Sequence, residues 1–131
     1  MADRDAFSSP FDEVVGTQVL EASGDRVVAQ VDVGPHLHQP TGIVHGGVYA
    51  TLVETTASVG ASLWLDGDAF AVGLSNQTDF LRAVTGGRLR VEATPVQRGR
   101  TLQLWQVSIT DEQQRLVASG RVRLMNRTAG T

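Results

Sequence analysis

The chain has 131 residues, 41% of them hydrophobic and 19% charged, which is enough to bury the core of one globular domain. A net charge of −3 gives no general reason to expect nucleic acid or an acidic membrane as a partner. All eleven basic residues are Arg, and the absence of cysteine excludes disulfides and Cys-ligated metal sites.

We expect the chain to consist of a flexible N-terminal arm at 1–12, a single domain at 13–127 and a C-terminal tail at 128–131. The arm carries charges and a proline and lacks the apolar core of a signal peptide, so we expect a cytoplasmic protein. Apolar and polar residues then alternate over 14–19 and 26–33, a pattern typical of half-buried strands.

The longest apolar stretch of the chain is interrupted by a single charge, Glu54. A loop rich in Gly, Pro and His precedes it, and a helix is predicted from Gly46 or Gly47 to about Leu65, where Asp-Gly-Asp ends it. Residues 48–65 are numerous enough to cross a bilayer, but the carboxylate and six hydroxyls oppose insertion. We therefore expect no membrane segment.

From residue 69 onward the hydrophobic period changes to two. The predicted strands are 69–82, 88–98, 101–111 and 115–126. Short turns separate them, and Thr-Gly-Gly-Arg at 85–88 is interpreted as a hairpin turn, so the four strands are predicted to form an antiparallel meander. A sheet of five or six strands curled around the one long helix would bury the apolar faces of both.

On the predicted helix, Glu54 shares a face with four small residues, which are Ala50, Ala57, Ser58 and Ala61. A partly buried glutamate without a basic neighbour tends to have a raised proton affinity, which suits a general base or nucleophile. A structural glutamate bonded to the backbone is the equally weighted alternative. The hydroxyl of Ser58, one turn on, is in reach to orient the carboxylate or a water.

The glycine pair at the predicted helix start offers a second chemical group. Amides in the first helical turn have no intrahelical acceptor, and glycine at position 46 or 47 allows close approach of a ligand. Chain reversal before a helix is the alternative explanation for the pair. Gly46 and Glu54 lie eight residues apart, roughly 12 Å along a helix, so one helix cannot bring both to one carbonyl. If both act, a twofold dimer must supply the second group.

The run QPTGIVHGGVYATLVETTAS resembles the signature of hotdog-fold acyl-CoA thioesterases, in the branch with a catalytic glutamate that includes 4-hydroxybenzoyl-CoA and 1,4-dihydroxy-2-naphthoyl-CoA thioesterases. The resemblance extends over roughly 10–126, through VGLSNQTDFLRAVTGGRL and the segments after it. It implies an α+β hotdog fold of five to six antiparallel strands wrapped around a central helix. It also implies a homodimer or homotetramer that needs no metal and no cofactor, coenzyme A being part of the substrate.

The same resemblance implies roles for single residues. Glu54 corresponds to the nucleophile or general base, and the Gly46 amide to the donor for the thioester carbonyl oxygen. Gln39 corresponds to a side chain that holds the substrate or the water, and Ser58 to the hydroxyl near the carboxylate. His45 is expected to cap the helix, with a direct catalytic role left open.

Five further residues are assigned to substrate binding, namely Gly47, Asn76, Phe80, Arg82 and Arg100. The two arginines are candidates for the phosphates of coenzyme A. Phe80 stands where some naphthoyl-type members carry His, which makes the pocket there more apolar and argues against the naphthoyl activity. The resemblance and the predicted pocket content favour an aromatic or medium-chain acyl group. The alternatives are a non-catalytic acyl-CoA binder, a carrier-protein thioesterase and, last, a hotdog dehydratase, whose motifs are absent.

Three histidines, His36, His38 and His45, lack the spacing of a metalloprotease site, and we expect no metal. No Gly-x-Ser-x-Gly elbow occurs, and no cysteine is available as a nucleophile. Acyl transfer would therefore depend on a carboxylate.

Overall fold

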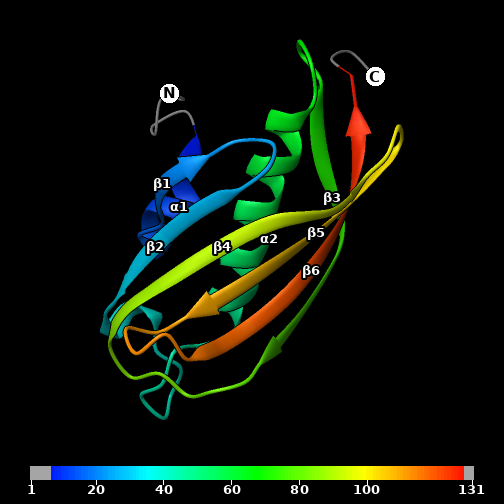
Figure 1. Cartoon of the computed structure of the whole chain (residues 1–131). Helices are drawn as coiled ribbons and strands as arrows, with labels where there is room; N and C mark the ends of the chain where they lie inside the picture. Colours follow the sequence, from blue (N-terminus) through cyan, green and yellow to red (C-terminus); the bar gives the residue numbers. More distant parts are fainter. Residues whose placement is uncertain (1–6, 129–131) are drawn as a thin grey trace.

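Helix α2, Gly46–Trp64, is the element around which the rest of the structure is arranged (Figure 1). The computed structural model describes residues 7–128, in which one antiparallel sheet curves around α2. Its strands are β1 (Gln18–Ala22), β2 (Val27–Val33), β3 (Phe70–Phe80), β4 (Gly87–Arg98), β5 (Leu102–Thr110) and β6 (Leu116–Arg127). The predicted α+β fold is confirmed. No helix within residues 7–128 combines the length and apolarity needed to cross a membrane.

The core lies between α2 and the concave face of the sheet. Alternate residues of the central strands are fully buried there, namely Leu89, Val91, Ala93, Trp105, Val107, Ile109, Val122 and Leu124. They pack in one cluster with Leu52, Val53 and Ala57 of the helix. A Cβ on Gly60 would lie 2.5 Å from the Trp105 ring, so the absence of a side chain at this position sets how closely helix and sheet approach.

The strand order is β1-β2-β4-β5-β6-β3. The predicted meander is right for β4, β5 and β6 but wrong for β3, which pairs with β6. Both edges of β4 are occupied by β2 and β5, so the connection at 81–86 must carry the chain across to the far side of the sheet. The segment at 85–88 is therefore not a hairpin turn. Strand β3 is left as an edge strand of the described sheet.

A short helix, α1 (Pro10–Val15), occupies part of the segment predicted as arm and strand. The Ser9 hydroxyl accepts a hydrogen bond from the Asp12 amide, proline stands in the first turn, and Gly16 ends the helix with a φ of 91°. These local signals override the alternation over 14–19, and the first strand begins only at Gln18.

Asp12 also ties α1 to the central helix. Its buried carboxylate accepts hydrogen bonds from Thr55 of α2, at 2.9 Å, and from Thr17, at 3.3 Å. The predicted boundary between arm and domain at residue 12 thus falls inside a docked helix. Residues 1–6 of the predicted arm and 129–131 of the predicted tail lie outside the described residues.

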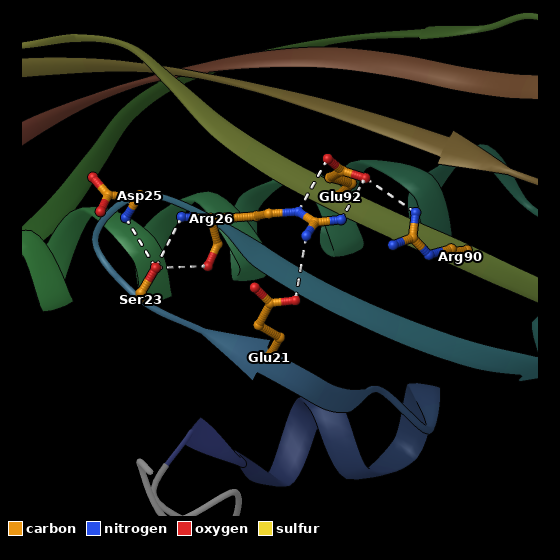
Figure 2. A network of polar contacts seen from close by, with 6 residues as sticks. All are labelled: Glu21, Ser23, Asp25, Arg26, Arg90 and Glu92. Atoms are coloured by element: carbon orange, nitrogen blue, oxygen red, sulfur yellow. Dashed lines mark hydrogen bonds and ion pairs between the residues drawn. The ribbon is translucent and has the colours of Figure 1, made fainter.

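The outer face of β1, β2 and β4 carries a network of ion pairs centred on Arg26 (Figure 2). The Arg26 guanidinium contacts Glu92 at 3.2 Å and Glu21 at 3.5 Å, and Arg90 contacts Glu92 at 3.0 Å. The hydrogen bond from Arg26 holds the pKa of the Glu92 carboxyl below its ordinary value. Each of these four charged side chains has an opposite charge beside it.

Candidate active site

The N-terminus of α2 presents a backbone donor without an acceptor. His45 caps the helix, as predicted, and its Nδ1 accepts a hydrogen bond from the Gly47 amide at 2.8 Å. The amide of Gly46, the first helical residue, has no acceptor among residues 7–128. It points from the positive end of the helix dipole, so it is suited to donate to a ligand oxygen that gains negative charge.

A pocket of about 330 Å³ opens at this end of α2. The loop before the helix and the segment after β3 meet there (Figure 1). Its lining residues are Gln39, Ile43, Val44, Gly46, Tyr49, Phe80, Leu81, Arg82 and Ala83. The two segments are joined by a hydrogen bond from the Val44 amide to the Val84 carbonyl, at 2.8 Å. Four predicted residues thus line one cavity although they come from two segments that are distant in the sequence. Gln39 and Gly46 belong to the first segment, and Phe80 and Arg82 to the second.

The Gln39 side chain adds a second donor to this cavity. Its Oε1 accepts hydrogen bonds from the Thr41 amide, at 2.6 Å, and from the Thr41 hydroxyl, at 2.9 Å. The tight turn depends on Gly42, whose φ is 85°. With Oε1 occupied, the Nε2 group keeps its two N–H donors, which have no acceptor in the described part of the chain.

Phe80 lies directly against the start of α2. A Cβ on Gly46 would overlap the Phe80 ring, so the close approach of this aromatic side chain requires glycine at the first helical position. The ring is also 6.0 Å from that of Tyr49, measured between centroids. Phe80 therefore forms one wall of the pocket beside the free amide.

Tyr49 is a pocket residue that the sequence reasoning missed. Its hydroxyl is buried without a hydrogen-bond partner among residues 7–128, and burial raises the pKa of Tyr49 above its ordinary value. Tyr49 lies three residues after Gly46, and this spacing places two helical residues on the same side. That spacing is the signal that identifies it in the sequence.

Glu54 lies outside the pocket. Its side chain is exposed in the single chain, so the expectation that one chain would partly bury it is wrong. Two of the small neighbours, Ala57 and Ala61, are turned into the core, and the half-buried Ser58 makes no hydrogen bond to the carboxylate within residues 7–128. Along the observed helix, Gly46 and Glu54 are still separated by roughly 12 Å.

Two predicted binding residues are placed elsewhere. The Asn76 side chain on β3 donates a hydrogen bond to the Ala50 carbonyl of α2, at 2.9 Å. Arg100 lies in the turn between β4 and β5. Two residues before it, the Arg98 guanidinium sits 5.5 Å over the ring of Trp64, which places this turn near the C-terminal end of α2. Arg100 therefore does not join the pocket of its own chain.

Comparison with known proteins identifies the family. The sequence model of the Thioesterase superfamily matches residues 41–118, which include the helix, its preceding turn and the strands that complete the pocket. This chain belongs to the thioesterase superfamily.

Individual relatives agree with this membership. A candidate esterase of Mycobacterium tuberculosis is 47% identical over 120 residues, covering 89% of this chain and 86% of that protein. The solved structure of that protein matches with a TM-score of 0.90 at 46% identity, covering 94% of this chain and all (100%) of the other. A 1,4-dihydroxy-2-naphthoyl-CoA hydrolase of Listeria monocytogenes is 31% identical over 109 residues, covering 83% of this chain and 89% of that protein. A solved thioesterase structure from Haemophilus influenzae has a TM-score of 0.92 at 30% identity, covering 98% of this chain and 90% of the other.

The thioesterase superfamily membership confirms the predicted hotdog fold and the predicted enzyme class. The sheet wrapped around α2 is the hotdog fold, and the chain is a thioester hydrolase. Acyl-CoA thioesterase activity is supported at the level of the family. The pocket at the start of α2 is lined by the Gly46 backbone and the Gln39 side chain.

Proposed function

We propose that this thioesterase hydrolyses acyl-CoA thioesters that carry an aromatic or medium-chain acyl group, in a site shared between two copies of the chain. One observation carries the proposal. The donors of Gly46 and Gln39 line one pocket, whereas the carboxylate of Glu54 is exposed on the same helix, roughly 12 Å away. One chain cannot bring both groups to the same carbonyl, so a partner must supply one of them.

The edge strand β3 supports such a partner. Its apolar side chains Phe70, Val72 and Leu74 are exposed by 41–48% in the single chain. An edge strand also offers unpaired backbone groups to another strand. A second copy that pairs antiparallel with β3 about a twofold axis would cover these side chains and run the two α2 helices in opposite directions. The Gly46 end of one helix would then face Glu54 of the partner subunit.

The proposed reaction uses these groups in sequence. The Gly46 amide and the Gln39 Nε2 donate to the thioester carbonyl oxygen and stabilise its negative charge in the transition state. Glu54 of the partner subunit either attacks the carbonyl carbon, expelling the coenzyme A thiolate and forming a mixed anhydride that water then hydrolyses, or removes a proton from an attacking water. Both routes consume one water and yield the free acid and coenzyme A. Ser58, one helical turn after Glu54, has the proposed role of orienting the carboxylate or the water in the assembled site.

The pocket lining supports the proposed acyl class. Ile43, Val44, Phe80 and Leu81 give it a mainly apolar wall, which suits an aromatic ring or a chain of medium length. Arg82 is the basic side chain of the lining and remains our candidate for a phosphate of coenzyme A. The Listeria relative is named for an aromatic acyl-CoA, which agrees with this class.

Thiol release from a panel of aryl- and fatty-acyl-CoAs tests the reaction. Glu54→Gln should lower kcat by about 100-fold or more, because it removes the nucleophile or base while leaving an exposed surface unchanged in shape. Glu13→Gln, the same change at another exposed glutamate, on α1, is the matched control and should retain wild-type kcat. Full activity of Glu54→Gln would contradict the mechanism, and tight binding without turnover by the wild type would favour a non-catalytic acyl-CoA binder.

Mixing two inactive variants tests the shared site. A heterodimer of Gly46→Ala and Glu54→Gln chains contains one site with both intact groups, so a mixture at equal amounts should regain about a quarter of wild-type activity. Each variant alone should stay inactive. No recovery in a mixture that forms heterodimers, or a monomeric mass in solution, would refute the shared site.

A further inference from the structure

Two hydrogen bonds that involve a side chain link α2 to the edge strand β3. The Asn76 Nδ2 donates to the Ala50 carbonyl at 2.9 Å, and the Ala71 amide donates to the Ser62 hydroxyl at 3.0 Å. The two helix positions are twelve residues apart, roughly 18 Å along the axis. The helix is thus attached to β3 at two separate points, one in its first half and one near its C-terminal end.

The Asn76 contact is made to the helical turn that carries Glu54. In an α-helix, the carbonyl of residue 50 accepts the amide of residue 54, so Asn76 adds a second donor to the same oxygen. The Thr78 hydroxyl donates to the Asn76 Oδ1 at 2.7 Å. With Oδ1 engaged by Thr78, the Nδ2 group is held toward the helix. Both heteroatoms of the Asn76 side chain are therefore engaged within the chain.

We propose that Asn76 is a positioning residue, which fixes the Ala50–Glu54 turn of α2 relative to the edge strand. This inference rests on the proposed function, in which β3 is also the strand that joins the second copy. In the proposed dimer, β3 contacts both α2 of its own chain and the second copy. The placement of α2 on β3 therefore sets the distance from Glu54 to the carbonyl bound in the partner subunit. A displacement of about 1 Å in such a geometry can lower a rate by about 100-fold.

Ser62 provides a matched control because it makes the same kind of contact far from the catalytic turn. Asn76→Ala and Ser62→Ala each remove one hydrogen bond between α2 and β3 that involves a side chain. If Asn76 acts on position, Asn76→Ala should lower kcat about tenfold and leave KM within about twofold, while Ser62→Ala leaves both unchanged. Thr78→Val keeps the Asn76 side-chain amide but removes the hydroxyl that orients it, so kcat should fall by an intermediate factor of about three.

Amide hydrogen exchange provides a second readout that does not need turnover. Asn76→Ala should accelerate exchange at the Glu54 amide several-fold relative to the wild type, whereas Ser62→Ala should not. Equal kcat values for Asn76→Ala and Ser62→Ala, or unchanged exchange at Glu54, would overturn the positioning role. If the wild type releases no thiol from any acyl-CoA, the proposed function fails, and the exchange measurement alone decides whether Asn76 holds this turn.

Discussion

The outer face of the sheet around Arg26 and the N-terminal half of α2 differ in whether their polar groups have a partner within the chain. On the outer face, Arg26 lies between Glu21 and Glu92, and Glu92 is shared with Arg90 (Figure 2). On the helix, the Gly46 amide and the Tyr49 hydroxyl lack a partner among residues 7–128, and the Glu54 carboxylate there is exposed. Folded proteins pair most of their buried polar groups, so the two unpaired groups at the start of this helix indicate where a ligand or a second chain belongs.

After the loss of Glu54, the largest effect is expected when Gly46 is replaced by Ala. The added methyl group would overlap the Phe80 ring, so either the ring or the first helical turn must shift. A shift of about 1 Å in the amide that binds the carbonyl oxygen should lower kcat/KM by about 100-fold. The rate of thiol release gives this ratio, and urea unfolding separates it from a loss of stability.

Two further variants decide whether the overlap with Phe80 is the cause. Gly86→Ala is the matched control, because a Cβ there meets no atom within 4 Å, and it should keep wild-type kcat/KM. Combining Gly46→Ala with Phe80→Ala removes the overlapping ring, so the double variant should lose less than the two single losses combined. Additive losses would show that the free amide fails for a reason other than the ring.

Local and periodic features of this fold could be predicted from the sequence, whereas pairing between distant segments could not. The period of two and the long apolar run predicted the strands of the second half and α2. The position of β3 beside β6 depends on which edges of β4 are already occupied, and that is settled only in three dimensions. Helix α1 was not predicted although Ser9 and Pro10 carry its capping signals, because polar residues before 13 are also typical of a flexible arm and the alternation over 14–19 is also typical of a strand.

The candidate site divides in the same way. The separation of Gly46 and Glu54 follows from helix geometry, and so does the inference that both can act on one carbonyl only if a second chain supplies one of them. Burial of Glu54 was predicted wrongly, because small neighbours indicate space beside a side chain but do not show which face of the helix the sheet covers. The spacing of Tyr49 from Gly46 is visible in the sequence. Only the packed structure shows that the Tyr49 hydroxyl is buried without a partner among residues 7–128.

A smaller effect, and one of opposite sign, is expected for Tyr49→Phe. The change removes a buried hydroxyl without a partner and keeps the ring that packs near Phe80. The free energy of unfolding should therefore rise by about 1 kcal/mol. Urea unfolding of wild type and variant at equal protein concentration gives the difference. A loss of stability instead would mean that the hydroxyl is paired in the assembled protein, and Tyr49 would then belong with the paired groups.

The smallest effect is expected for Glu92→Gln in the paired network, which should leave kcat unchanged because the network is not part of the pocket. The Glu92 side chain is 35% exposed, so solvent screening limits its contribution to stability to less than about 1 kcal/mol. Arg26 lowers the pKa of Glu92 in the folded state below its ordinary value of 4.5, so the contribution is present above pH 4.5 and is lost as the pH falls through the folded pKa. The difference in unfolding free energy between wild type and Glu92→Gln should therefore shrink on acidification. If the difference in unfolding free energy instead grew toward low pH, the ion pairs would not stabilise Glu92 as a carboxylate. The outer face would then not differ from α2 in the way described.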